Sequence, residues 1–275
     1  MIDKSNPTLE LIAVAYKNED EEAYWQVIQE IHQRGSEVEF SIACDLARSS
    51  DPVNREIGAD ILGQVGWVDG SFQDESIPIL IGLLQDPCDD VIASAAFSLG
   101  HRQAPLAISG LIKLVAHDNA RVREGVVSGL NGLDSSAAIS ALVTLSDDVD
   151  STVRSWATFG IGSLSEVDNQ MVRKALLDRA EDKDPETRGE ALIGLANRRV
   201  PDVQGYLLSE LSGEFNGNWA LEAARTMADP VYCSALCDLK RRETGVIEDR
   251  FIRDIDDAIA SCCGGQVSAP FKEIE

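Results

Sequence analysis

The chain has 275 residues, of which 47 are Asp or Glu and 24 are Lys or Arg, so its formal net charge is −23. A surface of this sign repels phosphate backbones, which argues against nucleic acid as a partner. The sequence shows no basic segment followed by an apolar leader and no apolar window of about 20 residues, so we expect a soluble, cytoplasmic protein that does not bind membranes. The acidic excess indicates either attraction to a basic partner or a charge that serves solubility alone.

The first expected elements are two helices, over residues 7–17 and 19–33. In the second, Trp25 and Ile28 share one face because they are three positions apart. The end of a repeat array must cover an otherwise exposed core, and its terminal units are therefore atypical. We assign residues 1–35 to an N-terminal capping helix pair.

After this pair, one helical phrase occurs six times. Neighbouring copies are 31 to 37 residues apart, a period typical of solenoids, in which each unit packs on its neighbours. The longest interval contains an extra segment, residues 66–73, which we expect to protrude as a loop. The six copies cover residues 51–63, 88–100, 119–131, 150–162, 184–196 and 216–228.

The first position of the phrase predicts a helix N-cap, because five of its six residues have short side chains that accept hydrogen bonds from the free N–H groups of a helix start. Four residues later an arginine occurs in four copies. In three of these copies we expect an i, i+4 ion pair with the capping aspartate. The caps are Asp51, Cys88, Asn119, Asp150, Asp184 and Asn216, and the arginines are Arg55, Arg123, Arg154 and Arg188.

Positions seven, eight and eleven after the cap are small or apolar and predict one buried helix face. The segments between the phrases, such as residues 77–84 and 139–145, carry an apolar periodicity of their own, so each unit contains two helices. No run alternates in the manner of a β-strand. We therefore predict an all-α fold, an α-solenoid that forms a right-handed superhelix of about eight helix pairs.

The last expected pair comprises helices over residues 230–241 and 246–261. We assign residues 230–263 to a C-terminal capping helix pair and residues 264–275, which contain Gly-Gly and a proline, to a flexible tail. Because repeats account for nearly all of the remaining length, residues 1–263 are predicted to form a single continuous domain.

Two segments resemble HEAT repeats: Asp-Lys-Asp-Pro-Glu-Thr-Arg at residues 182–188 and Asp-Pro-Cys-Asp-Asp-Val-Ile at residues 86–92. The most similar variety is the short repeat of phycobilisome lyases and many bacterial proteins, and the resemblance covers about residues 36–230. It implies the fold. It does not fix the function, because HEAT arrays serve as scaffolds, inhibitors, transport receptors and a few enzymes.

The chain contains six cysteines. Cys233 and Cys237 share a helix face, and Cys262 and Cys263 end the last expected helix, so a four-thiolate metal site is conceivable. The spacing matches no zinc module, however, and packing within a helix pair explains the first two cysteines equally well. We therefore assign no metal site, and the role of these four cysteines stays open.

Signals for an enzyme are sparse, and we assign no catalytic residue and no cofactor. The three histidines are scattered, and the chain has no His-Glu dipeptide, which excludes the HEAT-repeat enzyme deoxyhypusine hydroxylase because its iron ligands are His-Glu pairs. A phosphate-binding Gly-x-x-x-x-Gly-Lys-Ser/Thr loop and a Gly-x-Ser-x-Gly nucleophile motif are also absent.

Positions five, six and nine after each cap are expected to point away from the apolar stripe and to line the concave side of the array. Large apolar groups at these positions, flanked by acids, have the composition of a protein-binding hot spot. Alternatively, the aromatic groups pack into the grooves between repeats. The candidate partner-binding residues are Phe97, Glu124, Trp156, Phe159, Glu190, Ile193 and Glu222, and stacking is expected to align Phe97, Phe159 and Ile193.

From these features we predict a non-enzymatic solenoid, monomeric apart from its partner, that captures a basic protein in its concave face. A bacterial immunity protein that covers a cationic toxin surface is the most concrete version. One alternative is a bilin lyase or chromophore chaperone like the phycobilisome lyases, with Trp156 and Phe159 stacked on the pigment. A general scaffold is the other.

Overall fold

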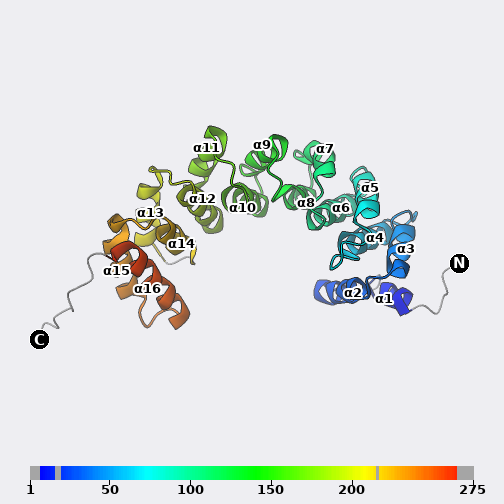
Figure 1. Cartoon of the computed structure of the whole chain (residues 1–275), viewed down its shortest axis with the longest axis horizontal. Helices are drawn as coiled ribbons and strands as arrows, with labels where there is room; N and C mark the ends of the chain where they lie inside the picture. Colours follow the sequence, from blue (N-terminus) through cyan, green and yellow to red (C-terminus); the bar gives the residue numbers. More distant parts are fainter. Residues whose placement is uncertain (1–6, 16–19, 215–216, 265–275) are drawn as a thin grey trace, which may run out of the picture. The chain divides into compact units, whose positions relative to one another are not determined.

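The computed structural model describes residues 7–15, 20–214 and 217–264, and within these ranges every regular element is helical. Sixteen α-helices follow one another as eight antiparallel pairs (Figure 1). The predicted all-α solenoid of about eight helix pairs is thereby confirmed. None of the described helices is long and apolar enough to cross a membrane.

The chain divides into two compact units, residues 1–157 and 158–275, which are described separately. The division falls within a helix and does not test the prediction of a single continuous domain, which stays a prediction. Except for Gly264, the predicted flexible tail lies outside the described residues.

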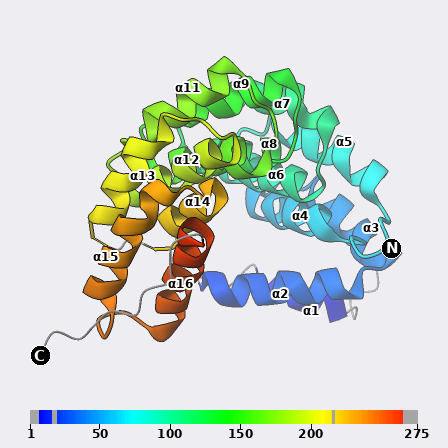
Figure 2. The same ribbon diagram turned by 60° about the vertical axis from the view of Figure 1, so that its left-hand side comes forward.

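Unit 1, residues 1–157, contains the first five helix pairs. Helices α2, α4, α6 and α8 pack on one another in succession and form one layer, and α3, α5, α7 and α9 lie along the other (Figures 1 and 2). Two 3₁₀ turns flank the short α7. The helices are α1 (Pro7–Ala15), α2 (Glu21–Arg34), α3 (Glu37–Leu46), α4 (Pro52–Gln64), α5 (Gln73–Leu83), α6 (Asp89–His101), α7 (Ile108–Leu111), α8 (Ala120–Leu130), α9 (Ser136–Leu145) and α10 (Ser151–Phe159).

Unit 2, residues 158–275, begins in the last turns of α10. The chain passes from α10 into a short π-helical segment, and a 3₁₀ turn precedes α15. Helix α14 packs on both α12 and α16, while α13 packs on α15. The elements are the π-helical segment (Gly160–Leu164), α11 (Gln170–Arg179), α12 (Pro185–Asn197), α13 (Val203–Ser212), α14 (Trp219–Met227), α15 (Cys233–Glu243) and α16 (Asp249–Cys263).

The predicted N-caps are confirmed at four of the six repeats. The side chains of Asp51, Asn119, Asp150 and Asp184 each accept a hydrogen bond from a backbone N–H of the first turn that follows. Cys88 occupies the N-cap of α6 without such a bond. The predicted cap Asn216 lies outside the described residues, and α14 starts after Asn218.

The apolar stripe is buried as predicted. Of its eighteen positions, only Met227 is more than marginally accessible. The buried members are Gly58, Ala59 and Leu62; Ala95, Ala96 and Leu99; Val126, Val127 and Leu130; Ala157, Thr158 and Ile161; Ala191, Leu192 and Leu195; and Ala223 and Ala224.

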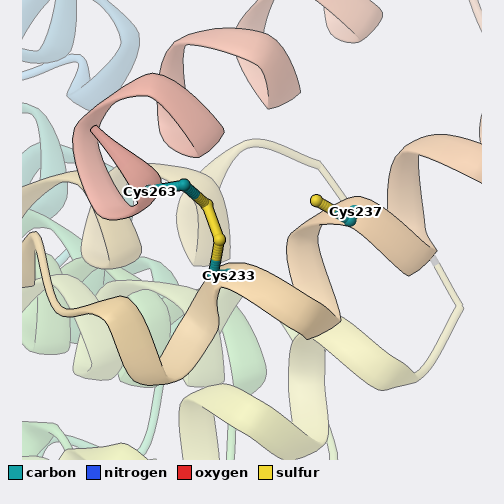
Figure 3. Close-up of side chains that lie close together, drawn as sticks. All are labelled: Cys233, Cys237 and Cys263. Atoms are coloured by element: carbon teal, nitrogen blue, oxygen red, sulfur yellow. A yellow bond between two sulfur atoms is a disulfide. The ribbon is translucent and has the colours of Figure 1, made fainter. Parts of the chain in front are cut away.

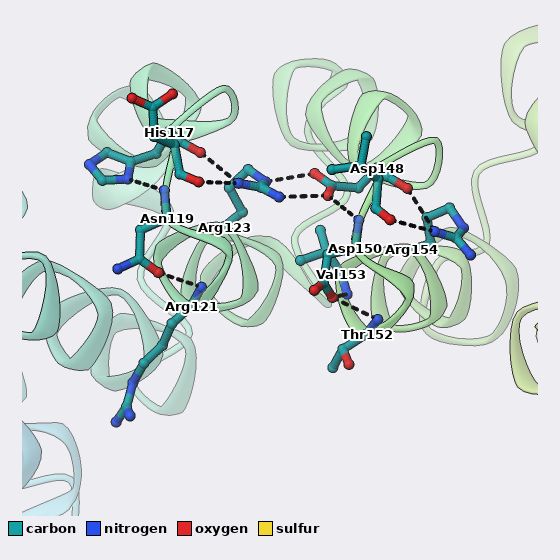
Figure 4. Close-up of polar contacts among 11 residues, drawn as sticks. His117, Asn119, Arg121, Arg123, Asp148, Asp150, Thr152, Val153 and Arg154 are labelled. Carbon is teal, nitrogen blue, oxygen red and sulfur yellow. Dashed lines mark hydrogen bonds and ion pairs between the residues drawn. The ribbon is translucent and has the colours of Figure 1, made fainter.

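The arginine four residues after the cap connects neighbouring repeats. Arg55 donates two hydrogen bonds to the carboxylate of Asp86, at 2.6 and 2.8 Å, and Arg123 binds Asp148 in the same way, at 2.7 and 2.8 Å (Figure 4). Each acid lies two residues before the cap of the following repeat. Of the three expected i, i+4 pairs, those of Arg55 and Arg188 are therefore not the principal ion pairs: Arg55 binds Asp86, and Arg188 binds Glu210 at 3.1 Å. The capping aspartates are held by the N–H groups that they cap.

A second kind of arginine donates hydrogen bonds to carbonyl groups at the C-terminal end of a helix in the preceding repeat. Arg102 is buried and donates to the carbonyl oxygens of Leu62 and Val65, with distances between 2.6 and 2.9 Å. In unit 2, Arg198 donates in the same manner to the carbonyl groups of Ile161 and Gly162. These carbonyl groups end a helix and have no partner within it, so the guanidinium groups satisfy them.

The loop that we predicted within the longest repeat interval is present. Its two aromatic side chains differ in their exposure to solvent. Trp67 is 59% exposed. Phe72 instead stacks on Phe40 of α3, with ring centroids 4.5 Å apart. The loop is therefore attached to the body of unit 1 at one end and presents Trp67 at the other.

The π-helical segment and α12 approach closely at glycine. A Cβ atom built on Gly194 would lie 2.6 Å from the Cα atom of Gly162. Real Cβ atoms do not approach backbone this closely, so the backbones of the π-helical segment and α12 would have to separate.

We expect Gly194→Ala to lower the free energy of unfolding by about 1–3 kcal/mol, because it overpacks a backbone contact. Gly205→Ala in α13 is the matched control: its Cβ meets nothing within 4 Å, and the better helix propensity of alanine adds up to about 1 kcal/mol. Urea unfolding of both variants measures the difference. Equal effects of the two substitutions would contradict the close approach.

Candidate functional site

The candidate site of unit 1 is a set of carboxyl groups on the layer formed by α2, α4, α6 and α8. In α4, Glu56 and Asp60 occupy positions five and nine after the cap. Asp90 occupies position two in α6, and Glu124 occupies position five in α8. We call Glu56, Asp60, Asp90 and Glu124 the acidic row. Its members come from three successive helices of one layer.

Asp60 is the buried member of the acidic row, with 6% of its surface exposed. The hydroxyl of Tyr24, from α2, donates to its carboxyl oxygen at 2.5 Å, and Ser94 of α6 also hydrogen-bonds to it. Burial raises the pKa of Asp60 to about 7, and the nearby charge of Glu56 adds to this rise, while the bonds from Tyr24 and Ser94 oppose it. Near neutral pH this carboxyl group is therefore partly protonated.

The other members of the row are partly buried or exposed, and a nearby carboxylate raises the pKa of Glu56 and that of Glu124. Burial raises the pKa of Glu56, and the charge of Asp90 raises it further. Burial also raises the pKa of Glu124, with a second contribution from Asp150. The exposed Arg121 lowers the pKa values of Glu56, Asp60 and Glu124, and in Figure 4 its side chain extends from α8 on the side away from Arg123.

Unit 2 repeats this arrangement on α12 and α14. Glu190 accepts hydrogen bonds from the indole N–H of Trp219 at 2.9 Å and from the hydroxyl of Ser163 at 3.2 Å. Burial raises its pKa, and the charges of Glu222 and Glu186 act in the same direction. A carboxylate fixed by two donors and crowded by two others is thus present in this unit as well.

The structure separates the predicted partner-binding residues into three groups. Trp156 is 54% exposed and Glu222 is exposed, so both are accessible. Phe97, Phe159, Glu124 and Glu190 are half-buried, and Phe97 packs against the cluster of Ile92, Ala93 and Val122. Ile193 is 6% exposed. Its assignment to a partner-binding surface is therefore corrected: it is packed among the repeats, as the alternative interpretation of these positions anticipated.

The predicted alignment of Phe97, Phe159 and Ile193 joins residues of both units and stays a prediction. Sequence reasoning did not select two residues that organise the site, Asp60 and Tyr24. Asp60 occupies the ninth position after its cap. Because that position was expected to line this face, the repeat pattern could have identified Asp60 as a site residue. Tyr24 belongs to the atypical first pair, and no repeat column identified it.

Asp60 gives a test of this geometry. Its pKa is raised on folding from 3.8 to about 7, so the folded protein binds the extra proton and stability falls as pH rises from about 4 to about 7. Asp60→Asn keeps an acceptor for Tyr24 and removes this charge. We expect the variant to gain stability relative to the parent over this interval, by at most about 4 kcal/mol at pH 8.

Urea unfolding of both proteins at several pH values measures this difference. His32, whose pKa burial lowers to about 4, produces the opposite slope, but it is present in both proteins and cancels in the comparison. A constant difference from pH 4 to pH 8 would show that Asp60 ionises as in the unfolded chain.

Comparisons with known proteins agree with this architecture. Residues 77–162 match the family model for HEAT repeats. Protein YibA of Escherichia coli strain K12 is 29% identical over 203 residues, which are 71% of this chain and 72% of YibA. The predicted resemblance to HEAT repeats is therefore confirmed.

Solved structures support the same fold. The X-ray structure of Escherichia coli YibA aligns with a TM-score of 0.67 at 23% identity and covers 96% of this chain and 99% of its own. An engineered protein aligns with a TM-score of 0.55 at 17% identity, covering 94% of this chain and 79% of its own. The complex of CpcE and CpcF of phycocyanin lyase from Nostoc sp. PCC7120 has a TM-score of 0.48 at 17% identity, covering 95% and 97%, which is too low to support an argument about activity.

Proposed function

We propose that this HEAT-repeat solenoid is a non-enzymatic binding protein that captures a basic protein partner on the face of its second helices. The observation that carries the proposal is the acidic row, in which burial and the charges of nearby acids raise the pKa values of Glu56, Asp60 and Glu124. In the unbound protein these carboxylates are poorly compensated. A lysine or arginine of a partner would compensate them.

The arrangement of the ion pairs supports this proposal. Arg55 and Arg123 are held in ion pairs with Asp86 and Asp148. Arg121 lowers the pKa values of the row, and Arg123 lowers that of Glu124, but burial outweighs both effects. The net charge of −23 adds a long-range attraction for a basic protein, which increases the rate of association at low salt. The desolvated carboxylates then give specificity at short range.

The finer version of the proposal is an inhibitor of the bacterial immunity type, in which the solenoid covers a cationic surface of a toxin. An acidic face that fits such a surface would block it sterically. The general scaffold is the broader version of the same proposal. The bilin-lyase alternative gains no specific observation from the described residues, and absorbance of the purified protein mixed with a bilin tests it directly.

The proposal is tested with a partner isolated on the immobilised chain from the organism of origin and then purified. In Glu56→Gln/Asp90→Asn/Glu124→Gln three charges of the acidic row are removed. We expect its association rate constant at about 0.05 M salt to be about tenfold lower or more, because electrostatic steering acts on association. For the parent, raising salt to about 0.5 M should have the same effect, since screening shortens the reach of exposed charges.

A control variant with the same charge change carries Asp45→Asn, Asp74→Asn and Glu75→Gln, which are exposed acids on α3 and α5 of the other layer. We expect it to retain most of the parental rate, and stopped-flow or surface-based kinetics measure all three proteins. If both variants lose the same factor, only net charge matters and the acidic row is not the binding site.

Trp156 tests the aromatic part of the proposed face. Because its side chain is 54% exposed, Trp156→Ala should leave the melting temperature nearly unchanged. If Trp156 anchors the partner, the substitution should weaken binding by about 2 kcal/mol or more. Trp67→Ala removes a similarly exposed tryptophan, 59% accessible, and serves as the control in calorimetric titrations. Unchanged affinity of the Trp156 variant would remove this residue from the site.

A further inference from the structure

Three cysteine sulfur atoms gather at the last helix pair of unit 2. Cys233 and Cys263 form a disulfide that joins α15 to α16, with their Cα atoms 5.6 Å apart. Cys237 lies one turn after Cys233 on α15, and in Figure 3 its sulfur lies on the same side of that helix as the disulfide. The ligand atoms of the three residues all lie within 4.8 Å of one another.

The fourth cysteine of the predicted set does not join them. The Cys262 side chain is 3% exposed, and its thiol donates to the carbonyl oxygen of Ala224 at 3.3 Å. Consecutive residues on a helix point about 100° apart, so Cys262 and Cys263 face different neighbours. The four-thiolate arrangement considered from the sequence is therefore replaced by a group of three sulfur atoms.

The packing of α15 on α16 holds this group in place on both sides. Lys240 of α15 forms an ion pair with Asp256 of α16 at 2.6 Å, and Leu239 and Ile255 are buried in the same pair of helices. The position of Cys263 relative to α15 therefore does not depend on the disulfide alone. Cys233 and Cys237 are partly accessible to solvent, so a reductant or an ion can reach them.

The dimensions suit a metal with thiolate ligands. Zinc binds thiolate sulfur at about 2.3 Å, so sulfur atoms of one tetrahedral site are on the order of 3.8 Å apart. The three sulfur atoms lie within 4.8 Å of one another, which is close to this spacing. Cys233 is the first residue of α15, and a helix N-terminus favours the thiolate over the thiol. Three thiolates at this spacing select soft cations over Mg²⁺ or Ca²⁺.

We propose that Cys233, Cys237 and Cys263, once the disulfide is reduced, bind one zinc-like cation through three thiolates, with water as the fourth ligand. A dithiol reductant supplies two electrons and two protons to break the S–S bond and itself becomes a disulfide. The metal then displaces one proton from each of the three thiols. Oxidation of Cys233 and Cys263 removes two of the ligands, so thiol redox state controls metal binding.

The test uses the full chain, reduced with a phosphine and kept free of oxygen, and Co²⁺ as the spectroscopic probe. We expect one equivalent of Co²⁺ to produce thiolate-to-cobalt charge-transfer absorption in the near ultraviolet and tetrahedral ligand-field bands in the visible. One equivalent of Zn²⁺ should remove both. The disulfide form should show neither, and Cys237→Ser should bind Zn²⁺ more than 100-fold more weakly, a larger loss than removal of an outer-shell partner causes.

Cys237→Ser retains both cysteines of the disulfide, so its oxidised form should melt as the parent does, which separates loss of a ligand from loss of the fold. Cys88→Ser, in unit 1, and Cys262→Ser are controls that should bind Co²⁺ as the parent does. The proposal is overturned if the reduced parent gives no charge-transfer band, if Cys237→Ser binds with parental affinity, or if Cys262→Ser abolishes binding.

Discussion

The structure depends on one repeated interaction, the arginine that connects the cap of its own repeat with the acid before the next cap. Arg123 donates to the carbonyl groups of His117 and Asp118 and, at the same time, to Asp148. Asp148 in turn accepts the backbone N–H of Asp150, which caps α10 (Figure 4). The guanidinium group thus binds the carbonyl groups of the turn before its own helix and the carboxylate of the neighbouring repeat. That carboxylate in turn binds the N–H group of the residue that caps the next helix. Because these bonds are charge-assisted and half-buried, each is stronger than a surface ion pair.

This use of arginine has a consequence for the opposite side of the inner helices. Arg55 and Arg123 form ion pairs between repeats. On the other side, the charge of Arg121 does not offset the effect of burial on the carboxyl groups of the acidic row. Asp60 and Glu190 are the extreme cases: each is held by hydroxyl or indole donors, and burial raises the pKa of each. Neutral donors orient a carboxylate without neutralising it. A face built in this way is less stable than one with paired charges, and under the proposed function this is the usual cost of a binding surface that is organised before its partner arrives.

Much of the fold follows from the sequence because periodicity reports local geometry. The cap, the apolar stripe and the helix pairs are properties of one repeat, so Asp51 and Leu62 could be assigned without knowledge of their neighbours. Contacts between repeats are different. The partner of Arg55 is Asp86, 31 residues away, and Ile193 is buried although its column points away from the stripe of its own helix. Neighbouring helices cover part of that face, and a helical wheel of one repeat cannot show which part.

The helix pair α15–α16 is held together by contacts of its own. Within the described part of α15 and α16, the ion pair of Lys240 with Asp256 and the disulfide of Cys233 with Cys263 connect the two helices directly. A cross-link between residues 30 positions apart stabilises a fold by about 3–4 kcal/mol, chiefly by restricting the unfolded chain. Reduction would release this constraint between α15 and α16. A metal held by Cys233, Cys237 and Cys263 would restore a connection between the same two helices, so that α15 and α16 stay cross-linked in either redox state.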